Sequence, residues 1–157
     1  MPREGDAAPD ISATLGTSDH DPFELSDHLG DGPVVLAFFP AAFAPVCSNE
    51  VVVLEEHLDR IREAGATVFG ISADAAYSLE AFGDQQGISF DLVSDMSGEA
   101  LRAYGVEIDI PEQGRYGIAD RAVFVLDGDG TVAYRWVAEE LVDEPDYEEI
   151  IAAVEAA

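Results

Sequence analysis

The chain is predicted to be a single α/β domain, because strand-like and helix-like segments alternate along its length. Its 157 residues suit one compact domain spanning 1–157 rather than two. The apolar share, 48%, is enough to build a sizeable core. No linker, low-complexity segment or internal repeat interrupts the pattern.

The strand-like segments are short runs bounded by turn residues. The run at 34–39, Val-Val-Leu-Ala-Phe-Phe, is continuously apolar, which is typical of a strand buried on both faces of a central sheet. Further strands are predicted at 11–15, 67–72, 89–93, 121–127 and 131–137. The last two flank Gly128-Asp129-Gly130, a favourable composition for a hairpin turn.

Helices are predicted from apolar residues at three- and four-residue steps and from signals at their ends. One apolar face is formed by Val51, Leu54, Leu58 and Ile61. Asp74 is expected to cap a helix that runs to Gln86 and stops at Gly87. A short helix at 97–104 and a terminal helix at 146–156 complete the alternation.

The charge balance is extreme, with 33 acidic residues, seven basic ones that are all Arg, and a formal charge of −26. Such a charge opposes binding to nucleic acid or to an anionic membrane, so neither is an expected partner. The acidic residues spread along the chain and do not form a tail. At about 1 M salt the Debye length is only about 3 Å, which screens this repulsion. The composition therefore indicates adaptation to a very salty environment.

The lengths of the apolar runs bear on the cellular location of the protein. None approaches the roughly 18 to 20 residues needed to span a bilayer. The opening Met-Pro-Arg-Glu-Gly-Asp is not followed by the apolar core of a secretory signal. We therefore expect a cytoplasmic protein.

Cysteine and histidine usage limits the possible chemistry. Cys47 is the single cysteine, so an internal disulfide and a thiolate metal cluster are both excluded. His20, His28 and His57 show no ligand spacing, and we expect neither a metal nor a cofactor. A lone cysteine is ordinarily a small buried hydrophobe. The residues around Cys47 favour a reactive thiol instead.

Those residues place a thiol at the start of a helix. The buried strand ends at Phe39 and an amphipathic helix begins a few residues later. Pro45 suits the first helical position, which puts Cys47 at about the third. A group there faces free backbone N–H groups and the positive end of the helix dipole. Both stabilise a thiolate, so the pKa of Cys47 is expected below the free value of about 8.5.

The segment 38–50, Phe-Phe-Pro-Ala-Ala-Phe-Ala-Pro-Val-Cys-Ser-Asn-Glu, resembles the active-site loop of peroxiredoxins. That family's pattern is Pro, three residues, Thr or Ser, two residues, Cys. Further segments resemble family segments in the same order, at 5–10, 70–74, 94–106 and 121–130. The resemblance covers nearly the whole chain and is nearest to the bacterioferritin-comigratory and alkyl hydroperoxide reductase E-like branches, in a one-cysteine form.

The resemblance implies a thioredoxin-like fold, with a central mixed β-sheet flanked by helices, and an antioxidant, thiol-dependent peroxidase. Cys47 would attack hydrogen peroxide or an organic hydroperoxide and become a sulfenic acid. With no second cysteine in the chain, an external thiol or redox protein would have to resolve it. Excess peroxide would otherwise oxidise Cys47 further. A homodimer is also expected from the resemblance.

The resemblance also suggests roles for the surrounding residues. Arg121 would hold the thiolate and stabilise charge on the departing oxygen. Pro40 would shield the thiolate from water, and backbone N–H groups near Val46 and Cys47 would bind the peroxide. Glu50 either orients Arg121 or is an ordinary helix-face carboxylate. The alternative for Arg121 is a surface ion pair, which its place at the start of a buried strand disfavours.

Ala44 departs from the family pattern, which has Thr or Ser there. Alanine offers no hydroxyl to the peroxide, and losing one such polar contact typically costs about 10² to 10³ in rate. It is also a poor helix N-cap. We therefore expect a weakened peroxidase. The alternative is a peroxide-sensing or interaction module with little turnover. A disulfide exchanger is disfavoured because no Cys-x-x-Cys pair is present, and a buried, inert Cys47 is the remaining possibility.

Overall fold

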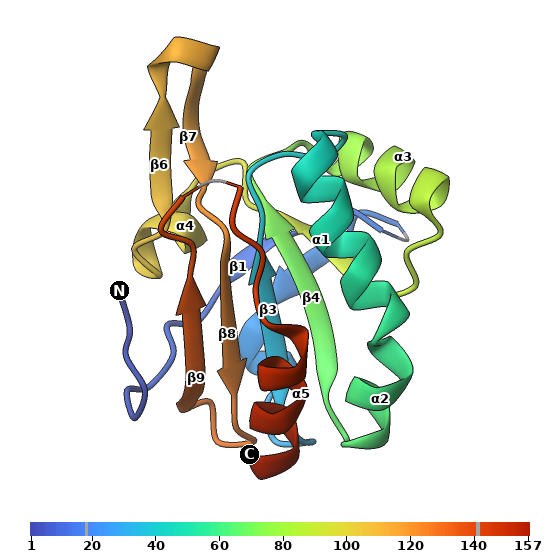
Figure 1. The fold of residues 1–157 in the computed structure, drawn as a ribbon, viewed down its shortest axis with the longest axis vertical. Coiled ribbons are helices and arrows are strands. Elements are labelled where there is room, and N and C mark those ends of the chain that lie inside the picture. Colours follow the sequence, from blue (N-terminus) through green and yellow to red (C-terminus); the bar gives the residue numbers. More distant parts are fainter. Residues whose placement is uncertain (18, 141) are drawn as a thin grey trace.

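The computed structural model has a seven-stranded sheet in the order β2-β1-β5-β4-β3-β8-β9, with helices on both faces (Figure 1). It describes residues 1–17, 19–140 and 142–157, and for residues 45–49 it describes the backbone without the side chains. The strands of this sheet are β1 Ser12–Leu15, β2 Pro22–Glu24, β3 Val34–Phe38, β4 Thr67–Ser72, β5 Asp91–Ser94, β8 Ala122–Leu126 and β9 Val132–Val137.

The sheet is mixed, as the resemblance implied. Strand β4 pairs in parallel with β3 on one side and with β5 on the other. Strands β1 and β8 join this parallel unit in antiparallel fashion, and β9 extends it as a hairpin with β8. Because β3, β4 and β5 run the same way, their carboxyl ends meet at one edge of the sheet. The loop that leads to Cys47 begins at this edge.

The central strand β3 divides its side chains between two cores. Val35 and Ala37 pack with α1 Pro45–Glu56, α2 Leu58–Glu63, α3 Ala76–Gln86 and α5 Tyr147–Ala156. Val34, Leu36 and Phe38 pack on the other face with the 3₁₀ turn η1 Leu25–His28 and with α4 Glu99–Ala103. All five residues of β3 are buried, which explains why its sequence is a continuous apolar run.

The helical face predicted between Val51 and Ile61 is formed by two helices instead of one. Helix α1 ends at Glu56 and α2 begins at Leu58, with His57 between them. The Nδ1 atom of the His57 ring lies 2.9 Å from the carbonyl oxygen of Val53, so the side chain competes for a backbone group of the helix. The four apolar residues of the predicted face are nevertheless all buried.

The predicted cap of the next helix is wrong, although its end is confirmed. Helix α3 has Ala75 as its N-cap, without a side-chain hydrogen bond. The Asp74 carboxylate faces a different loop, as described below. At the other end, Gly87 adopts a left-handed φ of 69°, a conformation that glycine reaches without strain.

Three strands fall where the sequence predicted none. Strand β2 pairs with β1 at the sheet edge. A separate hairpin joins β6 Glu107–Ile110 to β7 Arg115–Ala119 through the 3₁₀ turn η2 Pro111–Gln113, and it projects beyond the main sheet (Figure 1). In β6 exposed and half-buried residues alternate over only four positions, and β7 shows no regular alternation. Within the described residues, no helix has the length and apolar character needed to cross a membrane.

Candidate active site

The candidate site lies where β3 leads into α1. The connecting loop, residues 39–44, starts at the edge shared by the carboxyl ends of β3, β4 and β5. Pro45 is the first residue of α1 and Ala44 its N-cap, with no side-chain hydrogen bond from that cap. Both helix-start predictions are thus confirmed. Residue 47 is the third of twelve helical residues, within the turn whose backbone N–H groups lack helical partners.

The side chains of Cys47 and Val46 lie outside the described residues. Their backbone positions still relate them to the rest of the site. Residue 47 precedes Glu50 by three residues, and positions three apart on a helix share one face. Pro40 is buried near the carboxyl end of β3, and Ala44 is half-buried against the helical core.

Glu50 and Arg121 are the ionisable residues at the centre of the site, and both are almost fully buried, at 0% and 1% exposure. Arg121 immediately precedes β8, and its Nη1 donates to the carbonyl oxygen of Asp143 at 3.4 Å. Its backbone N–H donates to the Asp120 carboxylate at 2.9 Å. The interpretation of Arg121 as a surface ion-pair partner is therefore wrong. Glu50 likewise is not on a solvated helix face.

Burial raises the pKa of Glu50 to about 8, since a charged carboxylate is costly away from water. The positive charge of Arg121 opposes this shift, while the negative charge of Glu144 adds to it. Among the residues that the structure describes, neither carboxyl oxygen of Glu50 finds a hydrogen-bond partner. Glu50 is therefore mainly protonated at neutral pH, and the charge of Arg121 is not cancelled by it.

Tyr147 of α5 completes this cluster, and sequence reasoning missed it. Its ring stacks on His57 at 5.5 Å with an interplanar angle of 9°. Burial raises the pKa of its phenol, and the nearby charge of Glu50 raises it further. The approach depends on how α5 packs beside α2 and strands β8 and β9. No local pattern in the sequence signals such a contact.

A second set of contacts holds the loop that leads to α1. The backbone N–H of Ala42 donates to Asp74 Oδ2 at 2.8 Å. The next residue, Phe43, has a left-handed φ of 68°, which is costly for a non-glycine residue. The Phe43 ring packs edge-on against Phe82 of α3 at 5.3 Å. The loop is therefore fixed by α3 and by the end of β4.

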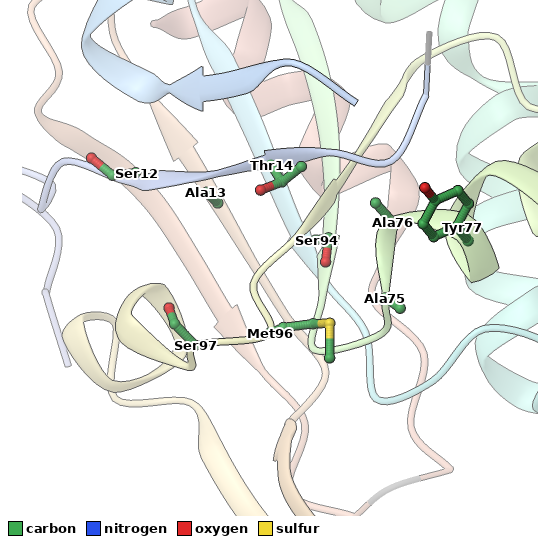
Figure 2. A pocket seen from close by; sticks show the side chains of 9 residues that line it. All are labelled: Ser12, Ala13, Thr14, Ala75, Ala76, Tyr77, Ser94, Met96 and Ser97. Carbon is green, nitrogen blue, oxygen red and sulfur yellow. The ribbon is translucent and has the colours of Figure 1, made fainter. Parts of the chain in front are cut away.

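An open pocket of about 500 Å³ lies between β1 and the segments that follow β4 and β5 (Figure 2). Its lining carries no charge and consists of Ser12, Ala13, Thr14, Ala75, Ala76, Tyr77, Ser94, Met96 and Ser97. Tyr77 and Met96 are strongly exposed, at 79% and 70%. In the part of the chain that the structure describes, no group of His, Cys, Asp and Glu side chains is arranged to hold a metal.

Comparison with known proteins defines the class. The fold is similar to that of the peroxidoxin BcpB of Mycobacterium tuberculosis, with a TM-score of 0.87 and 28% identity over 99% of this chain and 98% of that one. It is also similar to the bacterioferritin comigratory protein of Xanthomonas campestris, with a TM-score of 0.79 and 26% identity over 93% and 90% of the two chains. The predicted thioredoxin-like fold is confirmed.

The model of the AhpC/TSA family matches residues 4–135, so the chain belongs to that family. A putative peroxiredoxin of Mycobacterium tuberculosis is 35% identical over 130 residues, which cover 82% of this chain and 80% of the relative. Peroxiredoxin Bcp of Escherichia coli is 30% identical over 133 residues, which cover 84% and 83%. The protein is a Bcp-like peroxiredoxin, a thiol-dependent peroxidase.

The buried carboxyl of Glu50 predicts a specific pH dependence of stability. Its pKa is about 8 in the folded protein against 4.5 for a glutamate exposed to water, so the folded state retains a proton over this range. Glu50 therefore lowers the free energy of unfolding as pH rises from about 4.5 to 8, by up to about 1.4 kcal/mol per pH unit. Glu50→Gln, neutral throughout, should gain stability relative to wild type between pH 5 and 8.

Urea denaturation at constant high salt measures this difference. Glu63→Gln is the matched control, because Glu63 is an exposed carboxylate on the neighbouring helix α2. The control should follow the wild-type pH profile. Parallel profiles for Glu50→Gln and wild type would contradict a buried, protonated Glu50.

Proposed function

We propose that Cys47 is the thiol that reduces the peroxide. The supporting observation is its position, at the third residue of α1 and one turn before Glu50, which is buried near Arg121. The Cys47 thiolate attacks one peroxide oxygen, an S–O bond forms and the O–O bond breaks. The leaving oxygen takes up a proton and departs as water or an alcohol, and Cys47 becomes a sulfenic acid.

Arg121 is the cation that favours the thiolate and the charge on the leaving oxygen. Its burial supports this role, because a charge removed from water acts more strongly on its neighbours. Glu50, protonated at neutral pH, lies near the guanidinium without neutralising its charge. Pro40 limits water near the sulfur, and the backbone N–H groups of Val46 and Cys47 bind the peroxide.

Regeneration of the Cys47 thiol requires a reductant from outside the chain. One external thiol attacks the sulfenic acid and releases water, which leaves a mixed disulfide on Cys47. A second thiol then attacks that disulfide and frees Cys47. Because the sequence contains one cysteine, both thiols come from outside the chain. The reductant is therefore a small thiol or a redox protein.

The second candidate is a peroxide-sensing or interaction module with the same fold. Ala44 favours it, since the N-cap position offers no hydroxyl to the peroxide or to α1. The two candidates differ in turnover. With excess dithiothreitol an enzyme consumes many equivalents of peroxide per chain, whereas a sensor is oxidised once and stops.

We further propose that the uncharged pocket mediates a homodimer in a salty cytoplasm. Each chain carries a formal charge of −26, so a second copy is repelled by most of the surface. The pocket lining contains no charged residue, and Tyr77 and Met96 supply apolar area there. A second copy of the chain is the occupant that fits this neutral face once salt screens the remaining repulsion.

The role of Cys47 is tested by mass spectrometry of the intact protein. Brief exposure to one equivalent of hydrogen peroxide with dimedone, in high salt, should yield one dimedone adduct on the folded wild type. Cys47→Ser is the control and should yield none. An unmodified wild-type protein would contradict the proposed role of Cys47.

Restoring the missing hydroxyl should accelerate the reaction. Ala44→Thr is expected to raise the second-order rate constant with peroxide about 10²-fold or more, because a preorganised donor is regained. The same change should add about 0.5 to 2 kcal/mol to the free energy of unfolding through the N-cap. Stopped-flow oxidation and urea denaturation measure the two effects. A gain in stability with no change in rate would remove the catalytic role from position 44.

The dimer is tested by sedimentation at different salt concentrations. The wild type should dimerise at molar potassium chloride and dissociate as the salt is lowered. Tyr77→Glu should remain monomeric at high salt. Tyr116→Glu is the matched control, since Tyr116 is an exposed tyrosine on β7, outside the pocket lining. Dimerisation of Tyr77→Glu with wild-type affinity would place the interface elsewhere.

A further inference from the structure

The loop before Cys47 lacks the local hydrogen bonds that usually stabilise the start of a helix. Ala44, the N-cap of α1, makes no side-chain hydrogen bond, and Pro45 has no N–H to donate. Phe43 adopts a left-handed φ of 68°. A non-glycine residue in that region costs of order 1 to 3 kcal/mol and persists only when its surroundings hold it. Contacts from outside the loop must therefore maintain this conformation.

Asp74 provides a side-chain polar contact that reaches the loop. Its Oδ2 accepts the backbone N–H of Ala42 at 2.8 Å, one residue before Phe43. The same oxygen accepts the hydroxyl of Ser72 at 2.7 Å. A hydrogen bond to an ionised carboxylate is roughly twice as strong as a neutral one. The bond ties residue 42 to the end of β4.

Asp74 is itself held by two neighbouring strands. Its backbone N–H donates to Ser72 Oγ at 3.2 Å, and its carbonyl oxygen accepts the hydroxyl of Ser94 at 2.6 Å. Ser72 and Ser94 are the last residues of β4 and β5, and both are buried. The anchor of the loop is therefore set by the rigid parallel part of the sheet.

We propose that Asp74 is a positioning residue for the peroxidase reaction, acting through the Ala42 backbone to fix the start of α1. This inference rests on the proposed role of Cys47. The orientation of the first helical turn decides how well its N–H groups and dipole stabilise a thiolate at residue 47. A misplacement of about 1 Å costs about 10²-fold in rate in a preorganised site.

The variants Asp74→Ala and Asp74→Asn test this role against a merely structural one. The matched control is Asp91→Ala. Asp91 also uses one carboxylate oxygen to hold a distant segment, accepting Thr17 Oγ1 at 2.9 Å, but it begins β5, at the opposite end from the Asp74 network. Two readouts matter at high salt. These are the apparent pKa of Cys47, from the pH dependence of iodoacetamide alkylation, and the rate constant with hydrogen peroxide.

Asp74→Ala should raise the apparent pKa of Cys47 and lower the peroxide rate constant about 10- to 100-fold. Asp74→Asn should recover most of both, because its amide oxygen accepts the Ala42 N–H. Asp91→Ala should change only the melting temperature. A folded Asp74→Ala with the wild-type pKa and rate overturns the proposal. So does an Asp91→Ala variant that loses as much of both.

Hydrogen exchange in the wild type covers the case in which Asp74→Ala does not fold. The Ala42 amide should be protected from exchange. Exchange at the rate of an unstructured peptide would contradict the hydrogen bond between Ala42 and Asp74. Ser72→Ala removes one donor to Asp74 and should shift the Cys47 pKa in the same direction by a smaller amount. Alkylation does not depend on peroxide. If Cys47 fails to form a dimedone adduct, its proposed role in peroxide reduction is contradicted. The alkylation experiment still tests whether Asp74 positions the start of α1.

Discussion

Parallel pairing of β3, β4 and β5 is the constraint on which the site depends. It buries the apolar runs of these strands on both faces and brings their carboxyl ends to one edge. From that edge leave the loop to α1, the Asp74 segment and the Ser94 segment. Ala42 and Ser94, which are 32 and 20 residues from Asp74 in the chain, can then form short hydrogen bonds with it, because rigid strands bring them together.

The site contains a buried cation, although acidic residues dominate the whole molecule. The chain is strongly acidic, yet its buried centre holds the cation Arg121. Burial favours the neutral form of Glu50, so this carboxyl does not cancel the charge of Arg121 at neutral pH. A positive centre inside a −26 protein is what an anionic sulfur requires.

Local signals were read correctly where local physics decides. Pro45 begins α1, Ala44 is its cap, and Gly87 ends α3 in the left-handed region. Asp74 was misread because an Asp before a helix usually caps it, whereas here a strained loop competes for the carboxylate. Tyr147 could not be found, because its neighbours come from α1 and from the segment before β8, far away in the chain.

The sequence by itself determined the α/β pattern, the place of Cys47 in the first turn of a helix, the missing hydroxyl at residue 44 and the charge of −26. These follow from short-range periodicity, end signals and composition. Only the tertiary structure decided that Glu50 is buried near Arg121, that α5 brings Tyr147 to them, and that Asp74 holds Ala42. Those facts depend on which strands pair and how helices pack, and long-range packing leaves no mark in a local pattern.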